Sequence, residues 1–522
     1  MKKKVLLINP PYPFEESPTP PFGLMSLAAY LLENDIDVKI EDYIITPYSK
    51  ERITRIIDEF SPDYIGATGV TMNIKKSLSI LKDCSQVKED AVMVIGGPHA
   101  TFDADSILLE HRYIDFVVRG EGETTFTELI KNSGNSRTFR DIPGISFREG
   151  RTIINNSDRP FINDINILPF PARHLVQLSK YKAMGYPLNM VTSRGCPYNC
   201  IFCVGRKMVG SKVRYFDVNR VVDEFEMLSG MGFSQINVVD DLFTANQERC
   251  VAICDEIMHR GIRHKWNAFS RVDTISKELL LKLKQAGCEA LCFGIESGDQ
   301  GILDKAKKKI SIEKIRKAIS LCNEIGVAPM ASYIMGLPGE TPETIENSLK
   351  FAKDLCSNYG FHILAPFPGT EVRERSEEFG IKILTNDWDK YDANQAVCDN
   401  GTISPDKINE IAERFNNLFK NYVSDIIRKE ESGEQLSEKD KSYMDNLHKL
   451  SFSIDIIQKE CLENYRGITN ANSDSDVLRD FLVFVKDKTN ANENLAEKLL
   501  ERLLNINCIR VEGNDVKKLA WC

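Results

Sequence analysis

Three closely spaced cysteines are the residues of this 522-residue chain best suited to inorganic chemistry. Cys196, Cys200 and Cys203 have the spacing C-x3-C-x2-C within the stretch SRGCPYNCIFC. Iron–sulfur clusters are held by cysteine thiolates, normally four of them. Three thiolates on one loop would bind three irons of a 4Fe–4S cluster and leave the fourth iron open to a small molecule. A zinc site or reduced structural thiols are the alternatives, but zinc usually takes a second Cys/His pair at close spacing, and none follows this loop.

The composition predicts a cytoplasmic protein without a nucleic-acid partner. The net charge of −9 argues against a general nucleic-acid surface, which needs a basic stripe. No stretch approaches the roughly 20 apolar residues of a membrane-spanning helix, and the apolar run near the start, residues 5–8, is too short for a signal peptide. Fourteen cysteines in such a chain indicate reduced cytosolic thiols.

Residues 1–140 alternate short apolar strands with helical segments, which is the pattern of a parallel α/β sheet. We therefore expect a Rossmann-like N-terminal domain, whose ligand would bind in the loops at the carboxyl ends of the strands. Those loops are 9–12, 69–73, 96–101 and 120–123. None reads G-x-G-x-x-G, so a nicotinamide cofactor has weak support. Residues 141–184 are predicted as a linker with a small β excursion.

Strands and helices alternate again over residues 185–385, as a partial (β/α)6 barrel requires. Barrel enzymes place their chemistry at the carboxyl ends of the strands, and polar or glycine residues fall at those ends here. Residues 386–522 read as amphipathic helices, so the predicted fold class is α/β with a helical C-terminal domain. Most of the other cysteines of the barrel segment are expected to be small buried hydrophobic residues, namely Cys250, Cys254, Cys288, Cys292, Cys322 and Cys356. The cysteines beyond residue 386 are too scattered to predict a second cluster.

The cysteine loop, with an aromatic residue just before its last cysteine, resembles that of the radical S-adenosylmethionine (SAM) superfamily. The resemblance implies that the open iron binds the amino and carboxylate groups of SAM, which is cleaved to a 5′-deoxyadenosyl radical. Four strand ends match family positions in the correct order, although a single such charge is as often a solvated rim residue. The SAM-binding residues so implied are Phe202, Asp240, Asp241, Ser270, Arg271, Glu296, Ser297, Gly336 and Pro338.

Three loops of the first domain resemble those of cobalamin-dependent radical SAM enzymes: Asn-Pro-Pro, Gly-Gly-Pro-His-Ala-Thr and Arg-Gly-Glu-Gly-Glu. The D-x-H-x-x-G string that supplies a cobalt-binding histidine in cobalamin-dependent mutases is absent, so His99 is either a contact of the nucleotide tail or a structural residue. Glu121 and Glu123 are either cofactor contacts or favourable charges at a helix N-terminus. The cobalamin-binding residues so implied are Asn9, Pro10, Tyr12, Thr71, Met72, Asn73, Gly96, Gly97, His99, Thr101, Gly120 and Glu121.

The resemblance implies an enzyme with three cofactors: a 4Fe–4S cluster, SAM and cobalamin. The predicted reaction is methylation of an unactivated carbon in a small-molecule, lipid or natural-product substrate, with flavodoxin or ferredoxin as electron donor. An oxidative cyclase or another non-methylating radical reaction is the first alternative, because the order of motifs also resembles the anaerobic magnesium-protoporphyrin cyclase group. A non-catalytic cobalamin or iron–sulfur sensor is the alternative from another class. The methylthiotransferase class is a further alternative. Its members carry three further cysteines in the N-terminal domain, whereas this chain has only Cys84 there, which argues strongly against that class.

Overall fold

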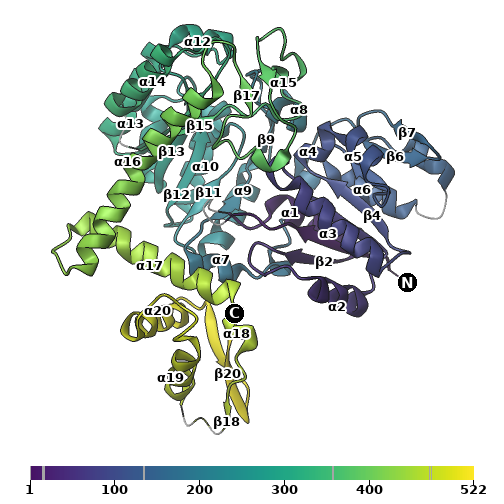
Figure 1. Cartoon of the computed structure of the whole chain (residues 1–522), viewed down its shortest axis with the longest axis vertical. Coiled ribbons are helices and arrows are strands. Elements are labelled where there is room, and N and C mark those ends of the chain that lie inside the picture. The colour runs from purple at the N-terminus through teal and green to yellow at the C-terminus, as the bar shows by residue number, and fades with distance from the viewer. Residues whose placement is uncertain (1, 14–17, 133–135, 356–357, 470, 472) are drawn as a thin grey trace.

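The computed structural model describes residues 2–13, 18–132, 136–355, 358–469, 471 and 473–522. They form a sheet unit, a barrel unit and a largely helical C-terminal unit (Figure 1). The predicted fold class is confirmed. Figure 1 shows the sheet unit beside the barrel, with the end of the chain packed beneath α7 (Leu178–Met184). Among the described residues, no helix is both long and apolar enough to span a bilayer.

The first unit is built on a seven-stranded sheet in the order β2-β1-β3-β4-β5-β6-β7. The first five strands are parallel, whereas β6 and β7 add antiparallel strands at the edge. These two strands are the small β excursion expected within residues 141–184, and they extend the first sheet. The strands are β1 (Lys4–Asn9), β2 (Asp37–Asp42), β3 (Tyr64–Thr68), β4 (Val92–Gly96), β5 (Phe116–Val118), β6 (Ile145–Glu149) and β7 (Thr152–Asn155).

Helices cover both faces of this sheet because successive side chains of a strand point to opposite faces. Leu7 belongs to the same apolar core as α1 and α6, while Leu6 belongs to the core formed with α2, α3 and α5. The helices are α1 (Phe22–Glu33), α2 (Lys50–Phe60), α3 (Ile74–Val87), α4 (Pro98–Phe102), α5 (Ala104–Glu110) and α6 (Gly122–Lys131).

The second unit is a partial barrel of six parallel strands in the order β15-β14-β13-β12-β11-β8. The strands are β8 (Leu188–Met190), β11 (Ile236–Val238), β12 (Trp266–Ser270), β13 (Cys288–Glu296), β14 (Ala328–Met335) and β15 (Tyr359–Ile363). The helices are α9 (Val218–Ser229), α10 (Gln247–His259), α11 (Lys277–Gln285), α12 (Gln300–Lys305), α13 (Ile312–Ile325) and α14 (Pro342–Leu355). Asn246, Ser276 and Ser311 begin α10, α11 and α13 by accepting a hydrogen bond from the backbone N–H three residues later.

A small substructure interrupts the barrel between β8 and α9. It consists of β9 (Ser193–Arg194), α8 (Gly205–Val209) and β10 (Arg214–Tyr215), and β9 pairs antiparallel with β10. The three cysteines of the motif lie between β9 and α8, so this hairpin is the frame on which the cysteine loop is mounted.

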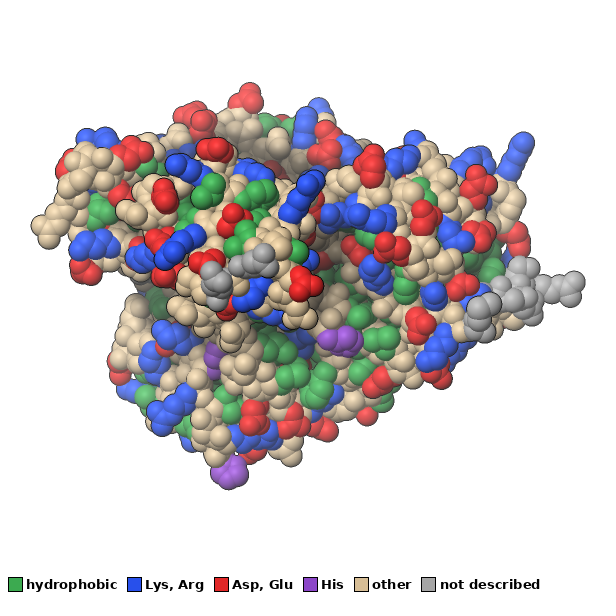
Figure 2. All heavy atoms as spheres, turned by 90° about the horizontal axis from the view of Figure 1, so that it is seen from below, with side chains coloured by type: hydrophobic (Ala, Val, Ile, Leu, Met, Phe, Trp, Pro, Cys, Tyr) green, Lys and Arg blue, Asp and Glu red, His purple; other side chains and the backbone are tan. Residues whose placement is uncertain are grey.

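The C-terminal unit contains the predicted helices and also a three-stranded sheet that the sequence did not reveal. Its elements are α15 (Glu371–Glu374), β16 (Lys382–Ile383), β17 (Cys398–Asp399), α16 (Pro405–Glu431), α17 (Glu438–Gln458), α18 (Cys461–Asn464), β18 (Ile468–Thr469), α19 (Asp474–Val485), α20 (Glu493–Asn505), β19 (Ile509–Glu512) and β20 (Val516–Trp521). The sheet has the order β18-β20-β19. Ser453 on α17 donates a hydrogen bond to the carbonyl of Ala183 on α7 at 2.9 Å, which ties this unit to the linker. Figure 2 shows positive and negative side chains interspersed over the face seen from below.

Candidate functional site

The three thiols of the cysteine loop lie near enough to one another to interact electrostatically. The pKa of Cys203 is raised to about 11, chiefly by burial, and the nearby Cys200 and Cys196 thiols add to this shift. Burial also raises the pKa of Cys196 and of Cys200. Among the described residues, no three His, Cys, Asp or Glu side chains are arranged to bind a single metal ion. A 4Fe–4S cluster does not need that arrangement, because each thiolate binds a different iron.

Backbone geometry fixes the course of this loop. Gly195 has φ +113°, and a Cβ there would lie 2.4 Å from the carbonyl oxygen of Lys212, so a glycine is required. The next residue, Cys196, donates its N–H to the carbonyl of Gly210 at 3.1 Å. Farther along, the N–H of Gly205 donates to the Cys203 sulfur at 3.3 Å, which helps to stabilise a thiolate there.

Two neighbouring aspartates at the end of β11 hold the start of the loop. Asp240 is buried and accepts three hydrogen bonds of 2.6 Å: from the N–H and hydroxyl of Thr192 and from the hydroxyl of Ser193. Asp241 accepts from the N–H of Gly195 at 3.1 Å. Burial raises the pKa of both carboxyls. Both were predicted to bind SAM. Both carboxylates therefore hold the segment that leads into the cysteine loop, and Asp240 does so with three hydrogen bonds whereas Asp241 does so with one.

Glu296, predicted to face SAM, forms a buried ion pair that the sequence did not suggest. Its carboxylate lies 2.8 Å from the Lys308 ammonium, and both side chains are 8% exposed. Glu296 has φ +74°, an uncommon conformation for a residue other than glycine, at a bulge in β13. A Cβ on Gly294 would lie 2.4 Å from this carboxylate and 2.9 Å from Lys308, so the glycine makes room for the pair. Ser297 is fully buried and its hydroxyl contacts that of Ser348 on α14 at 3.2 Å.

Arg271 lies against the cysteine loop. Its guanidinium is 3.4 Å from the centre of the Tyr198 ring, and it donates to both carboxylate oxygens of Asp273 at 3.0 and 3.1 Å. It also donates to the backbone carbonyl of Lys308 at 2.8 Å. The Lys308 ammonium is 5.9 Å from the centre of the Phe202 ring. The structure thus brings Phe202, Arg271 and Glu296 to one side of the loop.

The remaining predicted SAM-binding residues are held by neighbours within the chain. Ser270 shares a 2.6 Å hydrogen bond with Thr244. The turn at Gly336, which has φ +89°, is held by Glu340, whose carboxylate accepts the Gly336 N–H at 2.6 Å. Burial raises the pKa of Glu340 to about 8. Pro338 is buried in the same turn.

Three asparagines form a polar row that sequence reasoning missed. Asn189, Asn237 and Asn267 are paired in register on β8, β11 and β12. Each has a buried side-chain oxygen without a hydrogen-bond partner in the described part of the chain, and the amide of Asn189 donates to Thr19 at 2.8 Å. Buried polar atoms are normally paired, so unpaired ones mark places where water or a ligand binds. The available signal was an asparagine as the second residue of each of three short strands.

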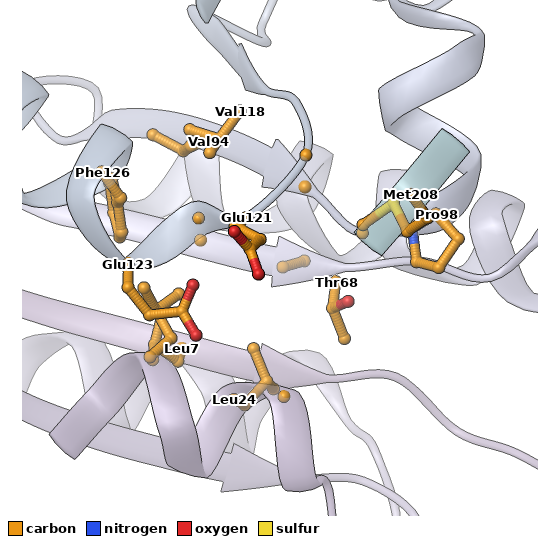
Figure 3. Close-up of a pocket in the computed structure, with 18 of the residues that line it drawn as sticks. Leu7, Leu24, Thr68, Val94, Pro98, Val118, Glu121, Glu123, Phe126 and Met208 are labelled. Atoms are coloured by element: carbon orange, nitrogen blue, oxygen red, sulfur yellow. The ribbon is translucent and has the colours of Figure 1, made fainter. Parts of the chain in front are cut away.

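A cavity of about 280 Å³ opens at the carboxyl ends of the first sheet. Four predicted cobalamin-binding residues line it: Gly96, Gly97, Gly120 and Glu121. Its floor is apolar, with Leu7, Val94, Val118 and Phe126, and Figure 3 shows Met208 of α8 at its other side. Arg194, two residues before Cys196, also lines it. The cavity and the cysteine loop therefore share a wall.

The other predicted cobalamin-binding residues are placed differently. His99 is 2% exposed, with its two ring nitrogens 3.2 Å from the Thr71 hydroxyl and 3.3 Å from the Asp103 carboxylate. Its ring packs edge-on against Trp388 at 4.9 Å, which favours the structural interpretation of this histidine.

The amide of Asn9 donates to the buried carboxylate of Asp42 at 2.8 Å, and the hydroxyl of Thr101 accepts from Gly120 N–H at 3.0 Å. Two more of the predicted residues, Met72 and Asn73, lie in the turn Thr71–Asn73. The side-chain oxygen of Asn73 accepts a hydrogen bond from the N–H of Val70 at 3.0 Å, which stabilises this turn. Pro10 is buried and Tyr12 half-buried just after β1.

Comparison with known proteins identifies the family of the chain. Two family models match: the Radical SAM superfamily over residues 190–352 and the B12 binding domain over residues 16–130. An uncharacterized methyltransferase of Pyrococcus horikoshii is 35% identical over 436 residues, 81% of this chain and 93% of that protein. An anaerobic magnesium-protoporphyrin IX monomethyl ester cyclase of Rubrivivax gelatinosus is 30% identical over 391 residues, 71% of this chain and 68% of the cyclase.

The solved structure of OxsB, a cobalamin-dependent SAM radical enzyme with aqua-cobalamin and SAM bound, is similar in fold. Its TM-score is 0.69 at 18% identity, over 97% of this chain and 80% of that one. The chain belongs to the radical SAM superfamily, in the group that also carries a B12-binding domain.

The protein is accordingly an enzyme whose cofactors are a 4Fe–4S cluster, SAM and cobalamin. Its residues fit these groups. Three thiols gather in one loop for the cluster, and a glycine-lined apolar cavity suits an organic cofactor that must approach the backbone closely. Cys196, Cys200 and Cys203 would hold the cluster, and the cavity residues would hold cobalamin. The assignment of individual SAM and cobalamin contacts stays a prediction.

Proposed function

We propose that the protein transfers a methyl group from SAM to an unactivated carbon of its substrate. The observation that carries this proposal is the shared wall between the cavity of the B12-binding domain and the cysteine loop, formed by Arg194, Met208 and Val209. Methyl transfer needs the two cofactors within reach of one substrate. The similarity to an uncharacterized methyltransferase along 93% of its length supports methyl transfer.

When bound, the cluster supplies the electron that cleaves SAM, and cobalamin supplies a carrier for the methyl group. The residues of this chain would bind SAM and cobalamin and orient them. Arg271 and the Glu296–Lys308 pair present charged groups beside the loop, where they suit the carboxylate and amino groups of SAM. The apolar floor of the cavity, with Leu7, Val94 and Phe126, would keep water away from the face of the cobalamin bound against it.

An oxidative cyclisation is the second candidate, and the similarity to the magnesium-protoporphyrin cyclase favours it. The two reactions differ in what becomes of SAM. Methyl transfer consumes two SAM molecules per turnover and releases S-adenosylhomocysteine together with 5′-deoxyadenosine. Cyclisation releases no S-adenosylhomocysteine, so the products of SAM distinguish the two candidates even before the substrate is known.

The test is an anaerobic assay of the protein reconstituted with iron, sulfide and cobalamin, given SAM and dithionite. Methyl transfer predicts that SAM labelled in its methyl group yields labelled methylcobalamin together with unlabelled S-adenosylhomocysteine. Cleavage predicts 5′-deoxyadenosine from the wild type and none from Cys200→Ala. Formation of 5′-deoxyadenosine without any S-adenosylhomocysteine or methylcobalamin would favour the cyclase. A protein that retains no cobalamin would contradict both candidates.

The proposal includes a low-potential electron donor such as flavodoxin or ferredoxin, because reduction of the cluster must precede each cleavage of SAM. It also includes a small-molecule, lipid or natural-product substrate. A cytoplasmic location is also part of the proposal, and the fourteen cysteines, which stay reduced in that compartment, support it. The row of Asn189, Asn237 and Asn267 offers hydrogen-bonding groups to a substrate that enters the barrel.

A further inference from the structure

Two carboxylates of the sheet unit and two guanidinium groups of the barrel unit form a bridge network, which comprises Glu121, Glu123, Arg194 and Arg214. Arg194 lies 3.1 Å from Glu121 and 2.7 Å from Glu123, and its guanidinium also contacts the hydroxyl of Ser26 at 3.4 Å. Arg214 binds both oxygens of Glu121 at 2.9 Å. The bridge network therefore spans the two units that carry the two cofactors.

The four charged groups of the bridge network are buried and balance one another. Their side chains are between 5% and 14% exposed. The Arg194 guanidinium holds the pKa of the Glu123 carboxyl below its usual value even though burial acts in the opposite direction. Buried charges keep their ionised forms only when they are paired with good geometry. The contacts of the bridge network thus restrict how far the two units can move apart.

Arg194 has the central place in the bridge network. It binds both carboxylates at the N-terminus of α6 as well as the hydroxyl of Ser26 on α1. Arg214 binds only one carboxylate, that of Glu121, and donates its other hydrogen bonds to the backbone carbonyls of Ile162 and Val209. Arg194 is also the last residue of β9, and Gly195 alone separates it from Cys196. Glu121, Glu123 and Arg194 all line the cavity, and Figure 3 shows the two carboxylates within it.

The opposite side of the same segment is fixed by the barrel. Asp240 accepts three hydrogen bonds from Thr192 and Ser193, and Asp241 accepts one from Gly195. The segment that leads into the cysteine loop is thus held on the barrel side by the two aspartates. On the side of the B12-binding domain it is held by the ion pairs of Arg194 with Glu121 and Glu123. A segment held from both sides transmits the position of one domain to the other.

We propose that Arg194 is a positioning residue that sets the separation between the cluster on the cysteine loop and the cobalamin in the cavity. Its planar fork reaches Glu121 and Glu123 together, which a lysine ammonium, as a single point of charge, would do less well. This inference rests on the two cofactors of the family and not on methyl transfer.

The test measures the separation through magnetic relaxation, without substrate or turnover. The protein is reconstituted with iron, sulfide and hydroxocobalamin and reduced so that it holds cob(II)alamin. The microwave power that half-saturates the cob(II)alamin EPR signal is then compared with the cluster oxidised and with the cluster reduced. A reduced, paramagnetic cluster accelerates the relaxation of a nearby cob(II)alamin, and this effect falls steeply with distance.

We expect Arg194→Gln to retain both cofactors and to show a several-fold smaller relaxation effect than the wild type. Arg194→Lys should lie between them, which a role in stability alone does not require. Arg173→Gln is the matched control. Arg173 forms a buried ion pair with Glu224 at 2.7 Å, with side chains 4% and 6% exposed, and neither residue lines the cavity. Loss of this ion pair in Arg173→Gln should leave the relaxation effect equal to that of the wild type.

A relaxation effect equal to that of the wild type, in Arg194→Gln with both cofactors bound, would overturn the inference. If Arg194→Gln fails to bind a cofactor, the relaxation effect is measured in Glu123→Gln and Arg194→Lys instead. Each of these variants weakens the bridge network but leaves some of its charged pairs in place. A reduced effect in both supports the inference, and a wild-type effect in both overturns it. Failure to methylate in the separate SAM assay would count against the proposed function and leave this result standing.

Discussion

Replacing Gly195 by alanine would place a methyl group where the backbone of Lys212 now lies. The new Cβ would be 2.4 Å from the Lys212 carbonyl oxygen, whereas contacts under 3.0 Å are essentially never seen, so the chain would have to move by at least 0.6 Å. The φ of +113° adds strain of about 1–3 kcal/mol for a residue with a side chain. Crowding against the backbone adds about 1–3 kcal/mol. The present course of the loop would thus be disfavoured by about 2 kcal/mol or more, roughly 30-fold.

The consequence of Gly195→Ala should appear as loss of the cluster. We expect reconstituted protein to hold less iron and sulfide per chain than the wild type, and to release iron faster to a chelator. Gly185→Ala is the control, because Gly185 has φ +82° but an added methyl group there would meet no atom within 4 Å, so only the conformational cost of about 1 kcal/mol applies. Iron retention in Gly195→Ala equal to that in Gly185→Ala would refute the argument.

Three further substitutions test other parts of the site. Lys308→Met leaves Glu296 buried and unpaired, which costs about 3–5 kcal/mol of stability. Calorimetry should therefore show a lower Tm, and titration with SAM should show a weaker affinity. An unchanged Tm and an unchanged affinity would contradict the role of the pair. Gly122→Leu projects a side chain into the cavity from a position whose Cβ meets only ordinary contacts of 3.7 and 3.9 Å, so cobalamin content should fall while iron content stays the same. Burial raises the pKa of Asp42 from 3.8 to about 6, so its ionisation lowers stability as the pH rises through this range, by about 3 kcal/mol at neutral pH. Asp42→Asn should therefore gain stability over the wild type in urea denaturation at neutral pH but not at pH values near 4, and a gain that is independent of pH would contradict this assignment.

The sequence was sufficient for the order of strands and helices wherever local signals were strong. Residues 386–522 were predicted to form amphipathic helices, and α16 (Pro405–Glu431) is the first of them, with Ser404 as its N-cap. Short strands that depend on distant partners escaped prediction. β18 comprises only Ile468–Thr469 and pairs with β20 nearly fifty residues later, so nothing in its own composition identifies it. By contrast, β6 was expected as part of the small β excursion, but the sequence did not show that it would pair with the edge of β5 and extend the first sheet.

The cysteines of the site were predictable because their spacing is local, whereas the partners of its charges were not. Glu121 and Glu123 were assigned either to the cofactor or to a helix N-terminus, and the structure pairs both with Arg194, more than seventy residues away. Lys308 gave no signal at all, since it is one of several consecutive lysines, yet it is the one that is buried against Glu296. Tertiary structure selects such partners, and a pattern of residue types along the chain does not contain that information.

The three hydrogen bonds that Asp240 accepts from Thr192 and Ser193 also have an evolutionary consequence. Loss of the carboxylate would leave two buried hydroxyl groups and an N–H without their acceptor, and loss of either hydroxyl would leave part of a buried carboxylate unpaired. Each unpaired buried group costs about 1–3 kcal/mol. Positions 192, 193 and 240 should therefore change together among relatives, so that a family member lacking the aspartate also lacks at least one of the two hydroxyl residues.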